Sequence, residues 1–180
     1  MDGVPLLEAQ FVCHCSSFLK GVRVFVEEPT TYGLRYITTC GPNVPIKCAT
    51  VIKYLLFCVP DASNDTVSSV RRVELYSLIN PRECIGAVDV PDIVLSLGGS
   101  PQGLVVVTAF AVLWYSPVET FRGDAVPTSV CNVPSGIKLT AICADSICIV
   151  SNDYPRTCTR PPRQSWRRSR SACGTLSAWR

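Results

Sequence analysis

The stretch from Gly103 to Tyr115, GLVVVTAFAVLWY, limits the folds open to this chain more than any other feature. It is apolar at both sets of alternating positions, so a strand made of it must be covered on both faces, inside a sheet. The run is about a dozen residues long, whereas a membrane-spanning helix needs roughly 20. The sequence therefore predicts a central core strand that contains Val106, Phe110 and Trp114, and it predicts no transmembrane segment.

Short apolar runs, separated by turn residues, fill most of the remaining chain. The 180 residues suffice for one ordinary domain, and the helices that an α/β fold places between its strands are missing. The pattern predicts a mainly β protein, an antiparallel β-sandwich or barrel of jelly-roll type. The glycine-rich segment 98–103 is predicted to be a hairpin loop. The expected strands are 22–26, 34–39, 49–59, 70–79, 93–97, 104–115, 137–144 and 147–150.

One helix is expected, at the N-terminus, over residues 5–20. Four apolar residues recur there at spacings of four, four and three: Leu7, Phe11, Cys15 and Phe18. This spacing places them on one stripe of a helix. Pro5 suits the first turn of such a helix, and Gly21 suits its C-terminal cap.

Charge divides the chain near residue 155. Seven arginines, no lysine and no acidic residue lie from Arg156 to Arg180. Of the 17 basic residues, ten therefore precede Arg156, against all 14 acidic residues, so the first part carries −4 and the last part +7. The last part has too few aliphatic residues to offset the entropy lost on ordering. We expect a β-rich globular domain over residues 1–155 and a disordered, arginine-rich tail over residues 156–180.

The tail is the candidate nucleic-acid-binding segment. Arginine pairs with phosphate through two hydrogen bonds and stacks on bases, and an adjacent tryptophan adds an aromatic platform. The tail thus predicts contact with single-stranded nucleic acid, RNA being favoured over DNA. The alternative is a solubilising or targeting tail without a specific ligand, and such a run is also typical of a nuclear-import signal. The predicted site residues are Arg156, Arg160, Arg163, Trp166, Arg167, Arg168 and Arg170.

Eleven cysteines raise the questions of disulfides and of a metal site. The N-terminus lacks the basic start of a signal peptide, so disulfides are not expected to persist. Cys13, His14 and Cys15 are adjacent, but the chain lacks the Cys-x-x-Cys pairing of common zinc sites. His14 is the only histidine, and on a helix neither neighbouring cysteine faces it. We predict reduced thiols, no metal, no cofactor and no enzymatic activity.

Asp61 directly follows an apolar run that begins at Val51. With the N-terminal helix, the core strand near residue 110 and the basic tail, this order of parts resembles the small plant-virus movement proteins of the thirty-kilodalton superfamily. It is also similar in outline to single jelly-roll viral coat proteins. The resemblance covers roughly residues 34–115 and the tail. It implies that Asp61 matches the aspartate that follows a hydrophobic strand in that family. The chain departs from the family in its short length and its many cysteines.

These features predict a non-enzymatic viral accessory or movement-type protein that binds single-stranded nucleic acid through its tail, in the host cytoplasm or nucleus. One alternative is an interaction module, for instance a host-defence suppressor, that meets a host protein through its sheet surface. A second is a small jelly-roll coat protein. An enzyme or redox protein that uses its cysteines ranks last. An oligomer is compatible with every one of these hypotheses.

Overall fold

The structure is a computed structural model of the chain. It describes residues 10–16, 18–28, 31, 33–61, 71–100, 103–116, 124–143, 146–151 and 155–159. The described residues are mainly antiparallel strands, which confirms the predicted class. The strands are β1 (Phe11–His14), β2 (Lys20–Glu28), β3 (Gly33–Ile52), β4 (Leu55–Pro60), β5 (Arg72–Ser77), β6 (Cys84–Asp89), β7 (Val94–Ser100), β8 (Gly103–Thr108), β9 (Ala111–Tyr115), β10 (Ser129–Asn132), β11 (Ile137–Cys143), β12 (Ser146–Ser151) and β13 (Pro155–Thr159).

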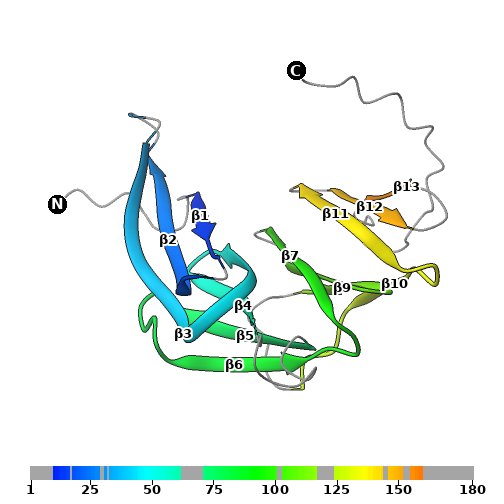
Figure 1. The fold of residues 1–180 in the computed structure, drawn as a ribbon, viewed down its shortest axis with the longest axis horizontal. Coiled ribbons are helices and arrows are strands. Elements are labelled where there is room, and N and C mark those ends of the chain that lie inside the picture. Colours follow the sequence, from blue (N-terminus) through cyan, green and yellow to red (C-terminus); the bar gives the residue numbers. More distant parts are fainter. Residues whose placement is uncertain are drawn as a thin grey trace.

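These strands form four successive antiparallel units, which we call blades. The first blade is β1, β2 and residues 33–40 of β3, and the second is residues 46–52 of β3 with β4, β5 and β6. The third is β7 to β10, and the fourth is β11 to β13. The first strands of neighbouring blades contact each other, β1 with β3, β3 with β7, and β7 with β11. Figure 1 shows the blades along an arc that is open on one side. This is the arrangement of consecutive blades in a β-propeller.

The long strand β3 joins the first blade to the second because it bends in the middle. The residues Gly41-Pro42-Asn43 separate the predicted strands 34–39 and 49–59, but they lie inside the single strand β3. Gly41 takes a positive φ of 98°, a backbone conformation that only glycine adopts readily. Its N–H donates a hydrogen bond to the Pro81 carbonyl at 2.8 Å, which ties the bend to the loop between β5 and β6. One strand therefore serves two blades.

Three apolar cores lie between the blades, one for each pair of neighbours. The core between the first and second blades includes Val22, Val24, Cys40, Ile46, Leu56, Cys58 and Tyr76. The core between the second and third includes Phe57, Val59, Val73, Leu75, Leu104, Val106, Leu113 and Tyr115. The core between the third and fourth includes Val105, Val107, Val112, Val133, Ile137, Ile147 and Ile149. Residues that alternate along one strand thus enter two different cores.

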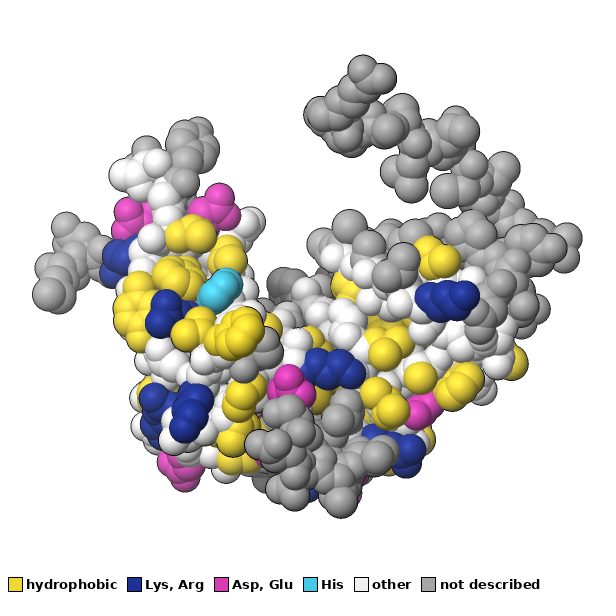
Figure 2. Space-filling view, viewed as in Figure 1, with side chains coloured by type: hydrophobic (Ala, Val, Ile, Leu, Met, Phe, Trp, Pro, Cys, Tyr) yellow, Lys and Arg dark blue, Asp and Glu magenta, His cyan; other side chains and the backbone are white. Residues whose placement is uncertain are grey.

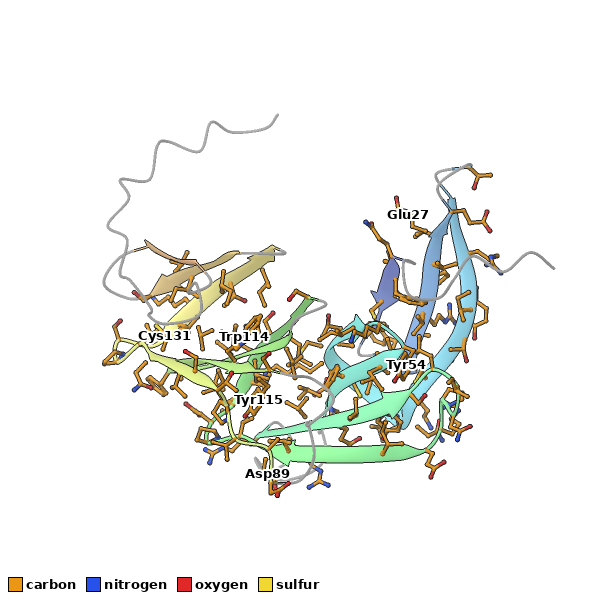
Figure 3. All side chains as sticks on the ribbon, turned by 180° about the vertical axis from the view of Figure 1, so that it is seen from behind. Glu27, Tyr54, Asp89, Trp114, Tyr115 and Cys131 are labelled. Atoms are coloured by element: carbon orange, nitrogen blue, oxygen red, sulfur yellow. The ribbon has the colours of Figure 1, made fainter. Side chains whose placement is uncertain are left out.

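This alternation explains why the sandwich or barrel arrangement is not seen in the described residues. A sandwich requires two facing layers, and each of its sheets is apolar on one face. The third blade is instead apolar on both faces, because Trp114 and Tyr115, adjacent in β9, pack against different cores. Figure 3 shows these two side chains on opposite sides of their sheet. Such a sheet needs a neighbour on each side, and an arc of blades provides both.

The apolar run at residues 104–115 is not one strand but a hairpin of β8 and β9. The prediction of a single strand was wrong because the turn contains no glycine or proline to reveal it. Buried Thr108 makes the turn instead: its hydroxyl accepts a hydrogen bond from the Ala111 N–H and donates one to the Ala111 carbonyl, both at 3.1 Å. A side chain that satisfies local backbone groups replaces the usual turn residues here. Val106 is fully buried as predicted, whereas Phe110 lies at the turn with 54% of its surface exposed.

A second hairpin was hidden in the predicted strand 49–59. Ile52 pairs with Leu55 across a two-residue turn, Lys53-Tyr54, that joins β3 to β4. Lys53 has φ 57°, the left-handed conformation that such a turn requires and that asparagine or glycine usually supplies. The remaining predicted strands all overlap observed ones. The sequence pattern missed β1, β6, β10 and β13.

The predicted helix at residues 5–20 is wrong wherever the structure describes it. Phe11–His14 is the strand β1, paired antiparallel with β2, and Phe18 is 93% exposed. Phe11 and Cys13 pack toward the first core, while Val12 and His14 lie on the other face. The four-residue alternation of β1 and the helical stripe share Phe11, and pairing with β2 decided between a strand and a helix. Residues 5–9 lie outside the described part.

The predicted boundary between domain and tail falls inside a strand. Residues 155–159 form β13, which pairs with β12 and places Arg156 opposite Ile149. The β-sheet therefore extends four residues into the segment 156–180 that was expected to be disordered. Residues 160–180 lie outside the described part of the chain.

The contacts between blades depend on two adjacent glycines in β7, Gly98 and Gly99. A Cβ atom at Gly98 would overlap Ile142 of β11, and one at Gly99 would overlap Ile52 of β3. Residues 98–99 were predicted to be part of a hairpin loop, and β7 and β8 do form a hairpin, with Ser100 opposite Gly103. The glycines themselves lie in the strand and let the blades on either side approach closely.

We predict that Gly98→Ala lowers the free energy of unfolding by about 1–3 kcal/mol, because the added methyl group overpacks the contact with Ile142. In a chain that already carries Ile142→Ala, the same change should cost much less. Urea denaturation of the four chains of this double-mutant cycle gives the coupling energy. Gly33→Ala is the control, since its Cβ would meet only Thr31. If Gly98→Ala lowered the free energy of unfolding equally in the chain with Ile142 and in the chain with Ile142→Ala, this account would be contradicted.

The two phenylalanines Phe57 and Phe110 test the arrangement of β8 and β9. Phe57 is fully buried in the core between the second and third blades, and Phe110 is half exposed at a turn. We expect Phe57→Ala to cost about 3–5 kcal/mol and Phe110→Ala less than about 1 kcal/mol. Denaturant titration of both variants measures this difference. A large loss for Phe110→Ala would restore the single core strand that the sequence predicted.

Candidate functional site

The predicted nucleic-acid-binding residues lie at and beyond the end of the described chain. Arg156 belongs to β13, the last strand of the fourth blade. Arg160, Arg163, Trp166, Arg167, Arg168 and Arg170 lie outside the described residues, so the structure neither brings them together nor separates them. It does show where their segment begins, at the end of the arc opposite the first blade.

Another candidate surface lies on the first blade, on the face that points away from the first core. Eight side chains, named below, lie on this face, and six of them are exposed. Figure 2 shows hydrophobic and basic side chains around the single histidine over β1–β3. We call this surface the free face of the first blade. Cross-strand register assigns to it Val12, His14, Arg23, Phe25, Glu27, Leu34, Tyr36 and Thr39.

An aromatic pair lies in the middle of the free face. Phe25 and Tyr36 are opposite each other on β2 and β3, with ring centroids 5.7 Å apart in an edge-to-face arrangement. The Tyr36 hydroxyl lies 2.9 Å from Thr39 Oγ1, which fixes the ring on the sheet. Tyr36 and Leu34 nevertheless expose 53% and 56% of their surface. Exposed aromatic and aliphatic side chains next to each other on a rigid sheet are typical of a docking surface.

Sequence reasoning did not find this face, although it predicted both of its longer strands. The alternation of Val22, Val24 and Val26 with Arg23 and Phe25 was the available signal. That signal shows that β2 has two different faces. It does not show which of the two faces another sheet covers. Only the position of the blade at the end of the arc leaves the Phe25 side open.

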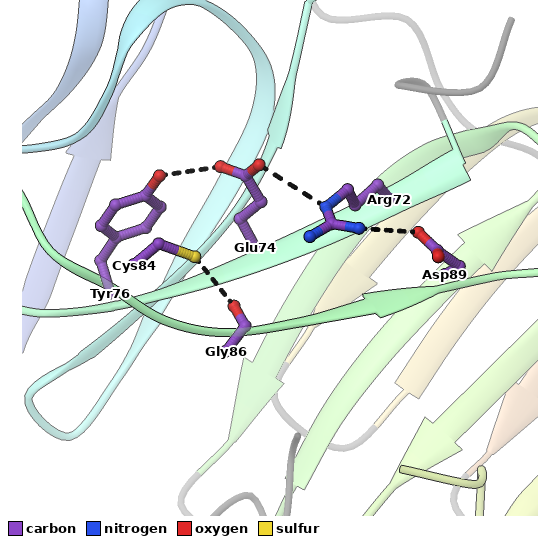
Figure 4. A network of polar contacts seen from close by, with 6 residues as sticks. All are labelled: Arg72, Glu74, Tyr76, Cys84, Gly86 and Asp89. Atoms are coloured by element: carbon purple, nitrogen blue, oxygen red, sulfur yellow. Dashed lines mark hydrogen bonds and ion pairs between the residues drawn. The ribbon is translucent and has the colours of Figure 1, made fainter. Parts of the chain in front are cut away.

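A polar network on the second blade has a structural role. Figure 4 shows Tyr76, Glu74, Arg72 and Asp89 in a row across β5 and β6. The Tyr76 hydroxyl donates to Glu74 Oε2 at 2.8 Å, and Arg72 reaches Glu74 at 3.8 Å and Asp89 at 3.4 Å. Burial and the hydrogen bond to Glu74 raise the pKa of Tyr76. These contacts satisfy the polar groups of β5. The face of β5 that carries Tyr76 packs against the first blade.

Cys13, Cys15, Cys40 and Cys58 are free thiols that pack in or against the first core. Cys48, also a free thiol, packs against the core between the second and third blades. Burial raises the pKa of Cys40 to about 11 and those of Cys13 and Cys48 to about 12. A thiol with a raised pKa stays protonated near neutral pH and is a poor nucleophile and a poor metal ligand.

The described residues offer no arrangement for metal or Cys–His chemistry. Within these ranges, no three His, Cys, Asp or Glu side chains are grouped so that they could hold a metal ion. His14 lies on the free face, whereas Cys13 packs against the first core on the other side of β1. In the same part of the chain, no helix has the length and apolar character needed to cross a membrane.

The buried thiols make stability depend on alkaline pH. Their pKa values are raised on folding, so the folded chain holds its thiol protons above pH 9, the ordinary thiol value, while the unfolded chain releases them. The stabilisation is complete below pH 9 and is lost as the pH rises toward 12.

We predict that the free energy of unfolding falls by up to about 1.4 kcal/mol per pH unit for each buried thiol. Urea titrations at pH 8, 9, 10 and 11 measure the slope. Cys48→Ala should make the slope shallower, whereas Val73→Ala, in the core that Cys48 packs against, should lower stability equally at every pH. A slope that Cys48→Ala does not alter would contradict burial of this thiol.

Comparison with known proteins supports the fold and leaves the family open. No protein-family model and no curated protein sequence matches this chain. Among solved structures, the computationally designed Ika8 protein is similar with a TM-score of 0.55 and 10% sequence identity, over 84% of this chain and 44% of that one. Hsv2 of Kluyvelomyces marxianus matches with a TM-score of 0.42 and 13% identity, over 69% of this chain and 35% of that one.

A variant called KlHsv2, whose loop 6CD is replaced by a Gly-Ser linker, matches with a TM-score of 0.44 and 10% identity, over 71% of this chain and 38% of that one. The chain thus spans less than half the length of each of these structures. At this level of identity the likeness to Ika8 concerns the fold alone.

Proposed function

We propose that the protein binds single-stranded nucleic acid through residues 156–180 and that it is not an enzyme. The observation that carries the proposal is the charge of this segment, with seven arginines and no acidic residue after Asp153. Arginine binds phosphate through paired hydrogen bonds, and Trp166 supplies a ring on which a base stacks. RNA is the favoured ligand, because proteins recognise RNA mostly in single-stranded regions.

The described surface supports the tail as the binding segment. Two arginines of the blades are already paired with carboxylates: Arg72 with Glu74 and Asp89, and Arg35 with Glu28 at 2.9 Å. The residues before Arg156 carry a net charge of −4, which repels a phosphate backbone. Protonated thiols in the first core also favour binding over catalysis.

The proposal extends to the biological setting, a viral accessory or movement-type protein in the host cytoplasm or nucleus. It follows from the basic arm on a compact β-rich body. The jelly-roll coat protein alternative rested on two facing sheets, and the described residues form an arc of blades instead. The arc therefore favours an accessory role over a coat role.

The salt dependence of binding tests the proposal. For Z phosphates contacted on a single strand, log affinity falls against log salt with a slope of about −0.7Z, so five engaged arginines give about −3.5. Replacing Arg167 and Arg168 by Gln should flatten the slope by about 1.4. Fluorescence anisotropy with a labelled oligonucleotide at several salt concentrations measures this change. Arg71→Gln with Arg82→Gln, two exposed arginines of the second blade, is the control with the same change in charge.

Two further variants test separately whether Trp166 stacks on a base and whether the tail is the binding segment. Trp166→Ala should weaken binding by about 1–3 kcal/mol without changing the slope, because stacking releases no counterions. A chain that ends at Thr159 keeps β13 in its sheet and loses six of the seven arginines. Unchanged affinity of this shorter chain, at matched salt, would refute binding through the tail.

A second candidate function is a protein-interaction module that acts through its sheet surface. The free face of the first blade favours it, because Leu34, Tyr36 and Val12 are exposed together on one sheet. Oligonucleotide binding that survives loss of residues 160–180 but is lost with Tyr36→Ala would favour this surface.

A further inference from the structure

The free face of the first blade carries a row of hydrophobic side chains that crosses its three strands. Strand register places Val12 of β1 opposite Phe25 of β2, and Phe25 opposite Tyr36 of β3. Val12 and Tyr36 are exposed, and Phe25 is half-buried with its ring against that of Tyr36. We call Val12, Phe25 and Tyr36 the apolar row. It presents adjacent hydrophobic groups to water on a rigid sheet, which is typical of a contact surface (Figure 2).

Charges of opposite sign lie on the two sides of the apolar row. Arg23 precedes Phe25 by two residues in β2 and Glu27 follows it by two, so all three share one face. Both charged side chains are exposed. Four residues of a strand span about 13 Å, so Phe25 keeps the two charges apart. Within the described part of the chain neither forms an ion pair, whereas Arg35 of the same blade pairs with Glu28.

This arrangement makes the free face complementary to itself. Two identical sheets that pack face to face are related by a two-fold axis that lies between them. When that axis runs along the apolar row, at right angles to the strands, each residue of the row meets its own copy. The same rotation exchanges the two ends of β2, so Arg23 of each copy lies over Glu27 of the other. An axis parallel to the strands would instead place Arg23 over Arg23, and like charges oppose such a contact.

The outer strands of the face fit the same rotation. On β1, His14 lies opposite Arg23, and the Gln10 carbonyl accepts a hydrogen bond from the Glu27 N–H at 3.0 Å. The rotation therefore places the exposed His14 over the exposed Gln10 of the other copy, a polar group over a polar group. The contact then has an aromatic centre and a polar rim, which is the usual composition of a protein interface.

We infer that the protein forms a symmetric dimer in which the free face of the first blade packs on the free face of a second copy. The apolar row lies on the two-fold axis, and ion pairs between Arg23 and Glu27 flank it on both sides. The inference goes beyond the proposed function and does not rest on it, because the dimer uses the first blade and nucleic-acid binding uses the tail. Residues 1–9, outside the described part, and a different protein are the competing occupants of the face.

Charge reversal at Arg23 and Glu27 tests the dimer through its symmetry. Arg23→Glu places two acidic groups together at each end of the contact, and Glu27→Arg places two basic groups there. Each change alone should raise the dissociation constant of the dimer at least about tenfold. A one-to-one mixture of the two variants pairs acid with base at both ends, so a heterodimer should form with nearly the affinity of the wild-type dimer. A chain that carries both changes should also dimerise like the wild type.

Sedimentation velocity of the nuclease-treated full chain, across the micromolar range, measures these assemblies. Nuclease removes nucleic acid that could bridge two tails. The wild-type chain should reach twice the 19.6 kDa of one chain as its concentration rises. Arg82→Glu and Glu83→Arg are the matched controls, because both residues are exposed between β5 and β6, outside the first blade. These two changes should leave the dimer intact.

Three outcomes would overturn the inference. The first is a wild-type chain that stays monomeric, which would leave the face to residues 1–9 or to a different protein. The second is a dimer that neither charge reversal at Arg23 nor charge reversal at Glu27 weakens. The third is a pair of monomeric variants, Arg23→Glu and Glu27→Arg, that do not combine when they are mixed.

Discussion

The fold depends on one constraint, the burial of both faces of each internal sheet. Hydrogen bonds in this chain are local, because each strand pairs with the strand before or after it. Strand pairing builds the blades, and single backbone hydrogen bonds such as that from the Ile137 N–H to the Ala109 carbonyl add links between them. Most of the attraction between neighbouring blades comes from apolar contact between their faces, with Tyr76, Phe57 and Ile149 in the three successive cores. Burial of apolar surface contributes roughly 25 cal/mol per Å², so these cores are the main source of stability.

The chain adapts its local chemistry to keep the blades close. Glycine appears where the backbone of one blade meets side chains of two others, at Gly98 and Gly99. Cysteine fills the first core as a small hydrophobic residue, and its raised pKa is a consequence of that packing. Neither feature requires a catalytic or metal-binding explanation.

Much of the fold could be predicted from residue patterns, and the failures have identifiable causes. The alternation in Val22–Val26 was readable, because side-chain period acts locally. The turns at Thr108–Ala111 and Lys53-Tyr54 were not, because a buried hydroxyl and a strained lysine take the place of glycine. The free face was not predictable either, since sequence shows that both faces of a strand are apolar but not where the neighbours end. The tail site remains a prediction from charge alone.

The shared strand β3 makes the two ends of the arc unequal. The first and second blades have a continuous backbone in common, so separating them breaks strand pairing as well as side-chain packing. The fourth blade is joined to the third through the short turn 133–136 and through side chains of the third core. When each unit contacts only its neighbours, local opening begins at the end with the weakest link. Amide hydrogen exchange is therefore expected to be fastest in β11–β13, so the basic segment is attached to the part of the molecule that opens most easily.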